Sequence, residues 1–410
     1  RWVGNEMLED YALRFTARKA RRWSSLTVAN TAFGGVSFLA LELIGGVTTV
    51  HYGFANAAVA LGLTCVLIFL TALPISFYAT RGGVDIDLLT RGSGFGYVGS
   101  TITSLVYASF TFIFFAIEGA ILAKILLACF GIPLWFGYII ATVLVVPIVA
   151  NGIRFISQFH LWTLPLWLGL QILPFVFLAR SGNGHALVME WTRFGGLDGT
   201  PGLSLMAVGA AASVMFSVVA QIGEQVDYLR FLPPPTTSGM TSRARWWLAL
   251  LFGGAGWIVF GGGKILAGSF LAWLVLHMGG TPADAVQPTV MYLLAFSNVT
   301  TYPTLALVLS ACFVMVSQIK INITNAYAGS IAWSNFFSRL THSHPGRVVW
   351  VLFNVTIALV LMEEGIHQTI TFTLIAYSCI AASWIGALVA DLTVNKPLGF
   401  SPAHTEFRRA

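Results

Sequence analysis

Long apolar stretches that recur along the sequence constrain this chain more than any other feature. Ten of them approach or exceed the roughly 20 residues that a helix needs to cross the hydrocarbon core of a bilayer. They lie at about 26–50, 54–79, 98–129, 133–152, 158–180, 203–228, 246–277, 304–336, 347–366 and 368–391. Only 9% of the 410 residues are charged, against about 25% in an average soluble domain. The sequence therefore predicts an all-α integral membrane protein with ten transmembrane helices.

The distribution of basic residues predicts how these helices are oriented. Arginine and lysine concentrate in cytoplasmic loops. If the N-terminal end is cytoplasmic, the outer loops hold only Arg180 and Arg193, and the inner loops and ends hold all the other basic residues outside the spans. We therefore expect a multi-pass protein of the cell inner (plasma) membrane with both termini cytoplasmic. The net charge of +6 then indicates contact with anionic membrane lipid, not with nucleic acid.

The segment LEDYALRFTARKARRW, residues 8–23, has an amphipathic helical pattern. One face carries apolar side chains and another carries arginines, namely Leu8, Tyr11 and Phe15 against Arg14, Arg18 and Arg21. This pattern is typical of a helix that lies in the membrane interface. A solvated basic linker is the alternative interpretation.

Two spans carry glycine or serine residues within the stretch where a transmembrane helix normally has large apolar side chains. Gly34 and Gly35 lie in the first span, and Ser213 and Ser217 lie in the sixth. Breaks placed five spans apart are typical of an inverted repeat of five helices, although small residues also allow close helix packing. We expect helices 1 and 6 to be broken there. The chain then divides into a cytoplasmic basic amphipathic segment, two five-helix repeats and a cytoplasmic juxtamembrane tail, at 1–25, 26–180, 203–391 and 392–410.

The third span contains a carboxylate and aromatic side chains on one helical face. Phe110, Phe114 and Glu118 recur every four residues, so their side chains lie above one another. An intramembrane carboxylate is a functional candidate by default, and aromatic rings beside it can stack on a flat ligand. Core or lipid-facing packing is the alternative role for the phenylalanines.

The eighth span is unusually polar. In VMVSQIKINITNAYAG, residues 314–329, one face carries Ser317, Lys320 and Thr324. The neighbouring face carries the three amides Gln318, Asn322 and Asn325. Amide groups offer both donors and acceptors, which suits recognition of a polar ring. Hydrogen bonds that only hold the helix bundle together are the alternative.

The chain shows no pattern typical of a catalytic or metal site. No cysteine–histidine cluster has metal-ligand spacing, and no arrangement of nucleophile, base and acid is apparent. All four cysteines lie in apolar runs, which indicates packing. We therefore predict no metal, no cofactor and no enzymatic activity.

Four segments together resemble the nucleobase:cation symporter-1 family, which comprises the purine–cytosine and hydantoin permeases. They are DLLTRGSGFGYVGS, VDYLRFLPPP, ITNAYAGSIAWSNFF and NKPLGFSPAHTEFRR, at residues 87–100, 226–235, 323–337 and 395–409. Residues 8–25 and 334–350 resemble a narrower group, in which a permease-like module precedes a hybrid sensor histidine kinase. The two further spans usual in the family, and any kinase domain, are absent from these 410 residues; the resemblance names a cytoplasmic kinase domain in a longer chain as a candidate partner.

The resemblance implies a leucine-transporter-type fold with two inverted five-helix repeats. The substrate of the family lies between spans 1, 3, 6 and 8. By motif, Phe114 takes the position of a tryptophan that stacks on the substrate, and Glu118 takes that of a glutamine that hydrogen-bonds it. The remaining substrate-binding candidates lie near the family's contacts in spans 6 and 8: Phe216, Ser217, Asn322 and Asn325.

The resemblance also bears on ion coupling. In sodium-coupled members, carbonyls at the break of span 1 and two hydroxyls of span 8 hold the ion, and those hydroxyl positions fall on Lys320 and Ile321. We therefore expect the Lys320 ammonium to stand in for sodium at the Gly34 and Gly35 carbonyls, with an ion pair to Glu42 or Glu118 as the alternative. The predicted function is a transporter of a small, flat, nitrogen-containing solute that is not sodium-coupled. The alternative is the ligand-sensing input module of a histidine kinase; a membrane enzyme is the third class weighed.

Overall fold

The computed structural model describes residues 15–197, 199, 202–234, 240–366 and 369–402, and all regular structure within them is helical. The first half of the chain contains α2 (Ser25–Gly34), α3 (Ala40–Gly82), α4 (Ile86–Thr90), η1 (Arg91–Phe95), α5 (Gly96–Phe130), α6 (Leu134–Ala150), α7 (Ile153–Arg180) and α8 (Gly184–Thr192). The second half contains α9 (Leu205–Met215), η2 (Phe216–Ala220), α10 (Gln221–Leu229), α11 (Met240–Gly253), α12 (Trp257–His277), α13 (Pro282–Ala285), α14 (Pro288–Ser297), α15 (Pro303–Thr341), α16 (Arg347–Glu363), α17 (Ile370–Ala390) and η4 (Asp391–Asn395).

Seven helical segments of the described residues are long and apolar enough to cross a membrane, by length and composition alone. They are Ala40–Gly82, Ile86–Phe130, Ile153–Arg180, Leu205–Leu229, Ser242–His277, Pro303–Thr341 and Ile370–Asn395. The predicted spans at 133–152 and 347–366 correspond to α6 and α16, which have 17 residues each. The all-helical membrane class is confirmed, while the total of ten crossings stays a prediction.

The first predicted span is broken where its glycines lie. Helix α2 ends at Gly34 and α3 begins at Ala40, so five residues between them are not in a helix. The hydroxyl of Ser37 in this break donates to the carbonyl of Gly34 at 3.0 Å and to that of Ser317 in α15 at 3.2 Å. The predicted break in helix 1 is therefore confirmed, and side chains satisfy part of its backbone.

The sixth predicted span changes its helical form instead of unwinding. Between α9 and α10 the segment Phe216–Ala220 is a 3₁₀ helix. The Ser213 and Ser217 hydroxyls donate to the carbonyls of Ala210 and Val214, each at 2.7 Å. Such side-chain bonds to the preceding turn compete with the regular helical ladder. The prediction is thus right about where helix 6 is irregular, but the structure shows a 3₁₀ segment and not the predicted break.

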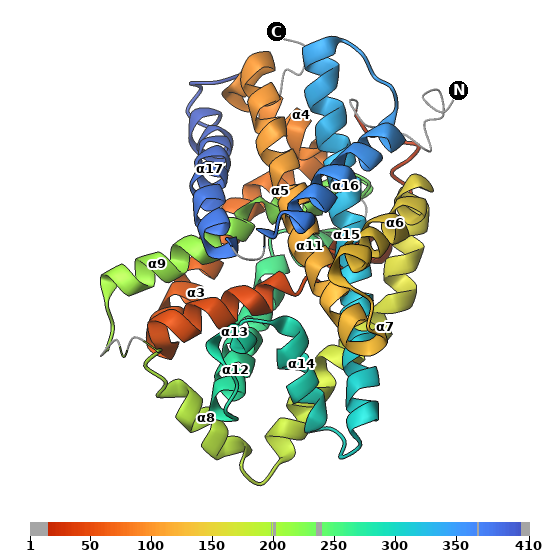
Figure 1. Cartoon of the computed structure of the whole chain (residues 1–410). Helices are drawn as coiled ribbons and strands as arrows, with labels where there is room; N and C mark the ends of the chain where they lie inside the picture. Colours follow the sequence, from red (N-terminus) through yellow and green to blue (C-terminus); the bar gives the residue numbers. More distant parts are fainter. Residues whose placement is uncertain (1–14, 198, 200–201, 235–239, 367–368, 403–410) are drawn as a thin grey trace.

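The first and last described residues lie at the same end of the molecule (Figure 1). The Thr16 amide donates to the Gly83 carbonyl at 2.8 Å, and Lys396 Nζ donates to the Gly92 carbonyl at 3.2 Å, so both bind the connection between α3 and α5. The residues from Phe15 to Trp23 contain only a turn, so the predicted interfacial helix is wrong for this part. Its earlier residues, including Leu8, Tyr11 and Arg14, lie outside the described residues.

Arg21 ties the described part of the N-terminal segment to the helix bundle. Its guanidinium donates to the carbonyls of Leu232 at 2.9 Å and of Thr80 at 2.5 Å, and the side chain is 7% exposed. These bonds tie the segment to the end of α3 and to the residues after α10. The membrane face on which this end lies remains the one predicted from charge.

The core is built from two extensive helix pairings, α5 with α15 and α3 with α12. In the second pairing, the backbones approach closely at glycines. A Cβ atom on Gly45 would collide with the backbone of Ile265, and one on Gly268 would collide with that of Glu42. Close approach through small residues is a common way for helices to associate in membranes. The second half of the broken helix is thereby fixed to α12.

Candidate functional site

The Glu118 carboxylate binds the restart of the broken helix. One oxygen accepts the Leu39 amide at 3.0 Å, and the other accepts the Ala40 amide at 2.8 Å. Leu39 is the N-cap of α3, and its own side chain makes no capping bond. An anion at a helix N-terminus is favoured by the helix dipole. Glu118, which is 0% exposed, therefore takes the place of a missing cap.

Aromatic rings pack against one another between the break and the face of α5 that carries Glu118. Phe114 lies edge-on to Phe38 with ring centroids 6.0 Å apart, and it contacts Phe110 at 4.5 Å. Trp257 lies 6.4 Å from Phe38, and its indole nitrogen is buried without a hydrogen-bond partner among the described residues. Two further rings, Trp257 of α12 and Phe38 of the break, therefore join the predicted face of α5 that carries Phe110, Phe114 and Glu118.

Three amide side chains of α15 are buried, two of them with unmet hydrogen-bonding atoms. Gln318, Asn322 and Asn325 are each 0% exposed. Asn325 Nδ2 donates to Asn322 Oδ1 at 3.4 Å. The Gln318 side chain lies against the Glu118 carboxylate, and within the described part of the chain Asn322 Nδ2 and Asn325 Oδ1 have no partner. Buried polar groups are normally paired, so these atoms indicate a site for a polar ligand or for water.

Helix α10 holds the other end of the break. Gln221 Nε2 donates to the Gly35 carbonyl at 3.4 Å and to Glu224 Oε2 at 2.7 Å. Glu224 is also 0% exposed, and its second oxygen has no partner among the described residues. The break is thus held by Glu118 where α3 begins and by Gln221 where α2 ends.

The Lys320 ammonium contacts α7, which corrects the predicted arrangement. It donates to the His160 carbonyl at 3.2 Å and to the Thr163 hydroxyl at 3.0 Å, and it lies 3.3 Å from His160 Nδ1. The carbonyls of Gly34 and Gly35 accept hydrogen bonds from Ser37 and Gln221 instead. The ammonium therefore donates to two acceptors of α7, and no bond from Lys320 to the break is among the described contacts.

His160 is a residue of this site that the sequence interpretation missed. Its ring is packed so closely on Gly34 that a Cβ atom there would collide with it. It is 0% exposed and links Lys320 indirectly to the break. A single histidine inside the apolar fifth span was the available signal, because intramembrane ionisable residues are usually functional.

Phe216 and Ser217 lie apart from this assembly in the described contacts. Their 3₁₀ segment packs mainly against α17, and the Ser217 hydroxyl binds its own helix at Val214. The structure therefore brings together Glu118, the aromatic rings and the break, but it shows no contact of Phe216 or Ser217 with Phe114 or Glu118. Their assignment to the ligand stays a prediction.

A second buried polar cluster lies farther along α3. Lys264 Nζ donates to Glu42 Oε1 at 2.7 Å and to Gln171 Oε1 at 3.1 Å. The Tyr292 hydroxyl accepts from Gln171 at 2.6 Å and donates to Glu42 at 2.8 Å, which closes a ring of four side chains. The alternative in which Lys320 pairs with Glu42 or Glu118 is therefore wrong, since Glu42 pairs with Lys264 and Glu118 caps α3.

Solved transporter structures of the leucine-transporter-type fold are similar to this chain over nearly its whole length, which shows that the chain has this fold. Mhp1, a nucleobase-cation-symport-1 family transporter, in a closed conformation with bromovinylhydantoin bound, superposes with a TM-score of 0.69 at 17% identity, covering 98% of this chain and 84% of Mhp1. The inward-facing conformation of Mhp1 gives a TM-score of 0.62 at 16% identity, covering 90% and 77%.

A sodium-coupled sialic acid symporter in a substrate-bound, outward-open state is similar as well. Its TM-score is 0.64 at 14% identity, with 95% of this chain and 82% of the symporter covered. No protein-family model matches the chain, and the curated proteins contain no match. At these identities the likeness shows the fold, and the chemistry has to be argued from the side chains.

Proposed function

We propose that this protein is a membrane transporter that binds a small, flat, nitrogen-containing solute, with nucleobase-like chemistry, and moves it by alternating access. The observation that carries this proposal is the break of helix 1, where the carboxylate of Glu118 holds the Leu39 and Ala40 amides. A broken helix at a binding site is how many transporters combine ligand contact with a hinge. Phe114 and Glu118 are 1% and 0% exposed, which corresponds to an occluded state.

The chemistry of the site supports a ligand with ring N–H and carbonyl groups. Each carboxylate oxygen of Glu118 has two lone pairs, and the helix cap uses one on each. The remaining lone pairs can accept ligand N–H groups, and such charge-assisted bonds are strong. The unmet amide atoms of Asn322 and Asn325 offer a donor and an acceptor, and Phe114 offers a ring for stacking.

We further propose that binding does not require sodium. Lys320 is 0% exposed and carries a positive charge where sodium-coupled members of the resembling family place a hydroxyl. A cation held next to this ammonium would be repelled at low dielectric. The ammonium contacts α7 instead of the Gly34 and Gly35 carbonyls, so the proposal rests on its charge and not on a bond to the break.

A ligand screen tests this function directly. The purified protein is heated in detergent with purines, pyrimidines, hydantoins and small amines, and the unfolding temperature is recorded. A ligand present at about 100 times its Kd stabilises the folded state by about 2.7 kcal/mol, which is readily measured. A flat compound with N–H and carbonyl groups is expected to stabilise the parent and not Glu118→Ala. Stabilisation of both proteins to the same extent would contradict the site.

A sensing function is the second candidate, and one contact favours it. Lys396, beyond the end of α17, pairs with Asp391 at 3.3 Å and donates to the Gly92 carbonyl in η1. Movement of the connection between α4 and α5 would therefore be transmitted to the segment after α17. A kinase dimerisation helix with a phospho-accepting histidine after Ala410 in the open reading frame would favour sensing. Ligand-dependent phosphorylation by the longer chain, lost in Lys396→Ala, would test it.

A further inference from the structure

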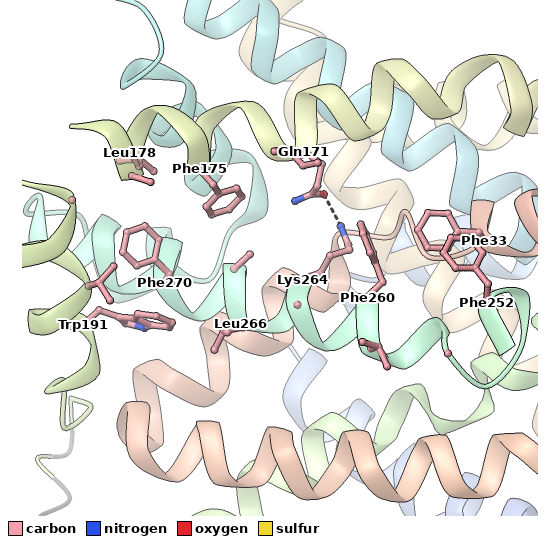
Figure 2. Close-up of a pocket in the computed structure, with 18 of the residues that line it drawn as sticks. Phe33, Gln171, Phe175, Leu178, Trp191, Phe252, Phe260, Lys264, Leu266 and Phe270 are labelled. Atoms are coloured by element: carbon pink, nitrogen blue, oxygen red, sulfur yellow. Dashed lines mark hydrogen bonds between the residues drawn. The ribbon is translucent and has the colours of Figure 1, made fainter. Parts of the chain in front are cut away.

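A long apolar groove runs beside α12, outside the candidate site (Figure 2). Its volume is about 830 Å³, and its walls come from α2, α7, α8, α11 and α12. Figure 2 shows aromatic side chains at both ends of the groove, with Phe33 and Phe252 at one end and Phe270 and Trp191 at the other. Among the lining residues, the polar side chains at its middle are Gln171 and Lys264.

The groove is open on the surface that would face lipid. Val259, Leu248 and Ile172 line it and are 69%, 65% and 53% exposed. On α12 the small residues Gly263 and Ala267 line the groove together with larger side chains, and the position of Gly263 faces open space. The lining residues of α12 and its N-cap extend from Gly256 to Phe270, which is about 21 Å at 1.5 Å per residue. This is sufficient for an acyl chain of one leaflet, which is about 15 Å deep.

Basic residues lie on α11 just beyond the end of the groove. Arg245 lies three and seven residues before the lining residues Leu248 and Phe252, so all three share one face of α11. Arg243 and Arg245 are exposed. The ring of Trp247 stacks on Phe77 at 5.7 Å, and the guanidinium of Arg81 lies 5.9 Å from the same Phe77 ring. Arginine beside tryptophan is typical of a membrane interface.

This end of the groove is also the end at which the chain begins and finishes. Trp246 Nε1 donates to the Pro233 carbonyl at 3.0 Å, and the adjacent Leu232 accepts a hydrogen bond from Arg21. By the charge distribution this is the cytoplasmic face, where the leaflet carries anionic lipid. The apolar groove thus lies at the depth of the acyl chains of a phospholipid, and the arginines at its α11 end lie at the depth of the headgroup.

We propose that the groove between α7, α8, α11 and α12 is a binding site for an anionic phospholipid of the inner leaflet. Its acyl chains fill the groove, and its phosphate contacts Arg243 and Arg245. The chains pass over Lys264, which is 2% exposed, and keep water from the Lys264–Glu42 pair. A drier surrounding strengthens this ion pair, so the bound lipid stabilises the attachment of α3 to α12.

Native mass spectrometry of the whole chain tests this site without any transported solute. The protein is released from mild detergent in the presence of phosphatidylglycerol or of phosphatidylcholine with identical acyl chains, and bound lipids are counted. One phosphatidylglycerol is expected to bind roughly 25-fold more tightly than phosphatidylcholine, at about fivefold for each arginine. Arg243→Gln combined with Arg245→Gln is expected to remove this preference while retaining weaker binding of both lipids.

Filling the groove tests where the chains lie. Gly263→Leu places a side chain in the groove and is expected to abolish retention of both lipids. The matched control is Gly62→Leu, since Gly62 lies in α3 with open space beside it and away from the groove lining; this variant is expected to behave as the parent. If Gly263→Leu does not purify as a folded protein, Ala267→Leu on the same lining face replaces it.

The inference is overturned if the parent binds the two lipids equally, or if Gly263→Leu retains phosphatidylglycerol as the parent does. A lipid-free dimer of the parent that Gly263→Leu abolishes would also overturn it, because a second copy of the chain would then occupy the groove. None of these results bears on solute binding at Glu118, so failure of the lipid site and failure of the proposed function are distinguishable.

Discussion

The Lys320 ammonium lies 3.2 Å from the His160 carbonyl oxygen, and the His160 ring in turn packs on Gly34 at the break of helix 1. Only the His160 side chain thus lies between Lys320 and the backbone of the break at Gly34. The His160 carbonyl and the Thr163 hydroxyl both accept from Lys320 Nζ, so α7 fixes the position of this side chain. We propose that a site organised in this way does not require a sodium ion.

We therefore expect ligand affinity to be independent of sodium in the parent protein. The ligand Kd measured in sodium and in choline buffer is expected to agree within about twofold. Lys320→Ser removes the charge and restores a hydroxyl, and it is expected to bind at least about fivefold more tightly in sodium, the lower end of typical coupling between two sites.

Lys124→Ser is the control, because Lys124 is a lysine of α5 that is only partly buried and has no hydrogen bond or ion pair among the described residues. It is expected to respond to sodium as the parent does. A steep sodium dependence of the parent itself would contradict the interpretation of Lys320.

Glu118 caps α3 and is proposed to bind the ligand, and two substitutions separate these two roles. Glu118→Ala leaves the buried Leu39 and Ala40 amides without acceptors, at about 1–3 kcal/mol each, so the unfolding free energy is expected to fall by about 2–6 kcal/mol. Glu118→Gln keeps one acceptor oxygen and adds a donor, so it is expected to lose less stability and to prefer ligands with an acceptor at that place. Chemical unfolding and the ligand screen measure the two effects. An alanine variant that binds ligand as the parent does would reject Glu118 as a ligand residue.

Features encoded within one span could be predicted from the sequence. The apolar stretches define the membrane helices, and the glycines at 34 and 35 mark a break that the structure confirms. Both depend on local composition and conformational freedom. The irregularity near Ser213 and Ser217 was predicted from its place five spans after the first break. Its 3₁₀ form, in which both hydroxyls bond to their own backbone, was not predicted.

Partners on distant helices could not be predicted. Glu118 binds backbone amides, which have no sequence signature, and Lys320 meets His160 across 160 residues of sequence. Glu42 and Lys264 were both visible as intramembrane charges, but their pairing across 222 residues depends on how α3 and α12 pack. Charge in a membrane helix therefore indicates that a partner exists, and only the three-dimensional arrangement identifies it.

Two glycines of α12 provide a matched test of how closely that helix packs on α3. A Cβ atom on Gly268 would collide with the backbone of Glu42, whereas one on Gly263 meets open space. Gly268→Ala is expected to cost about 1–3 kcal/mol of unfolding free energy through overpacking. Gly263→Ala is expected to be neutral or to gain up to about 1 kcal/mol from helix propensity. Equal effects in a chemical unfolding titration would contradict the close contact at Gly268.

The Glu42–Lys264 pair permits a double-mutant cycle, because both side chains are buried and their charged atoms lie 2.7 Å apart. Lys264→Met leaves an unpaired carboxylate beside Gln171 and Tyr292, and it is expected to cost about 3–5 kcal/mol of unfolding free energy. Glu42→Gln combined with Lys264→Met removes both charges and is expected to recover at least about 1 kcal/mol of that loss. Lys124→Met controls for the loss of an intramembrane lysine and is expected to change stability little. If the effects of Glu42→Gln and Lys264→Met simply add, the two side chains are not coupled, and the ring of four polar residues does not act as a unit.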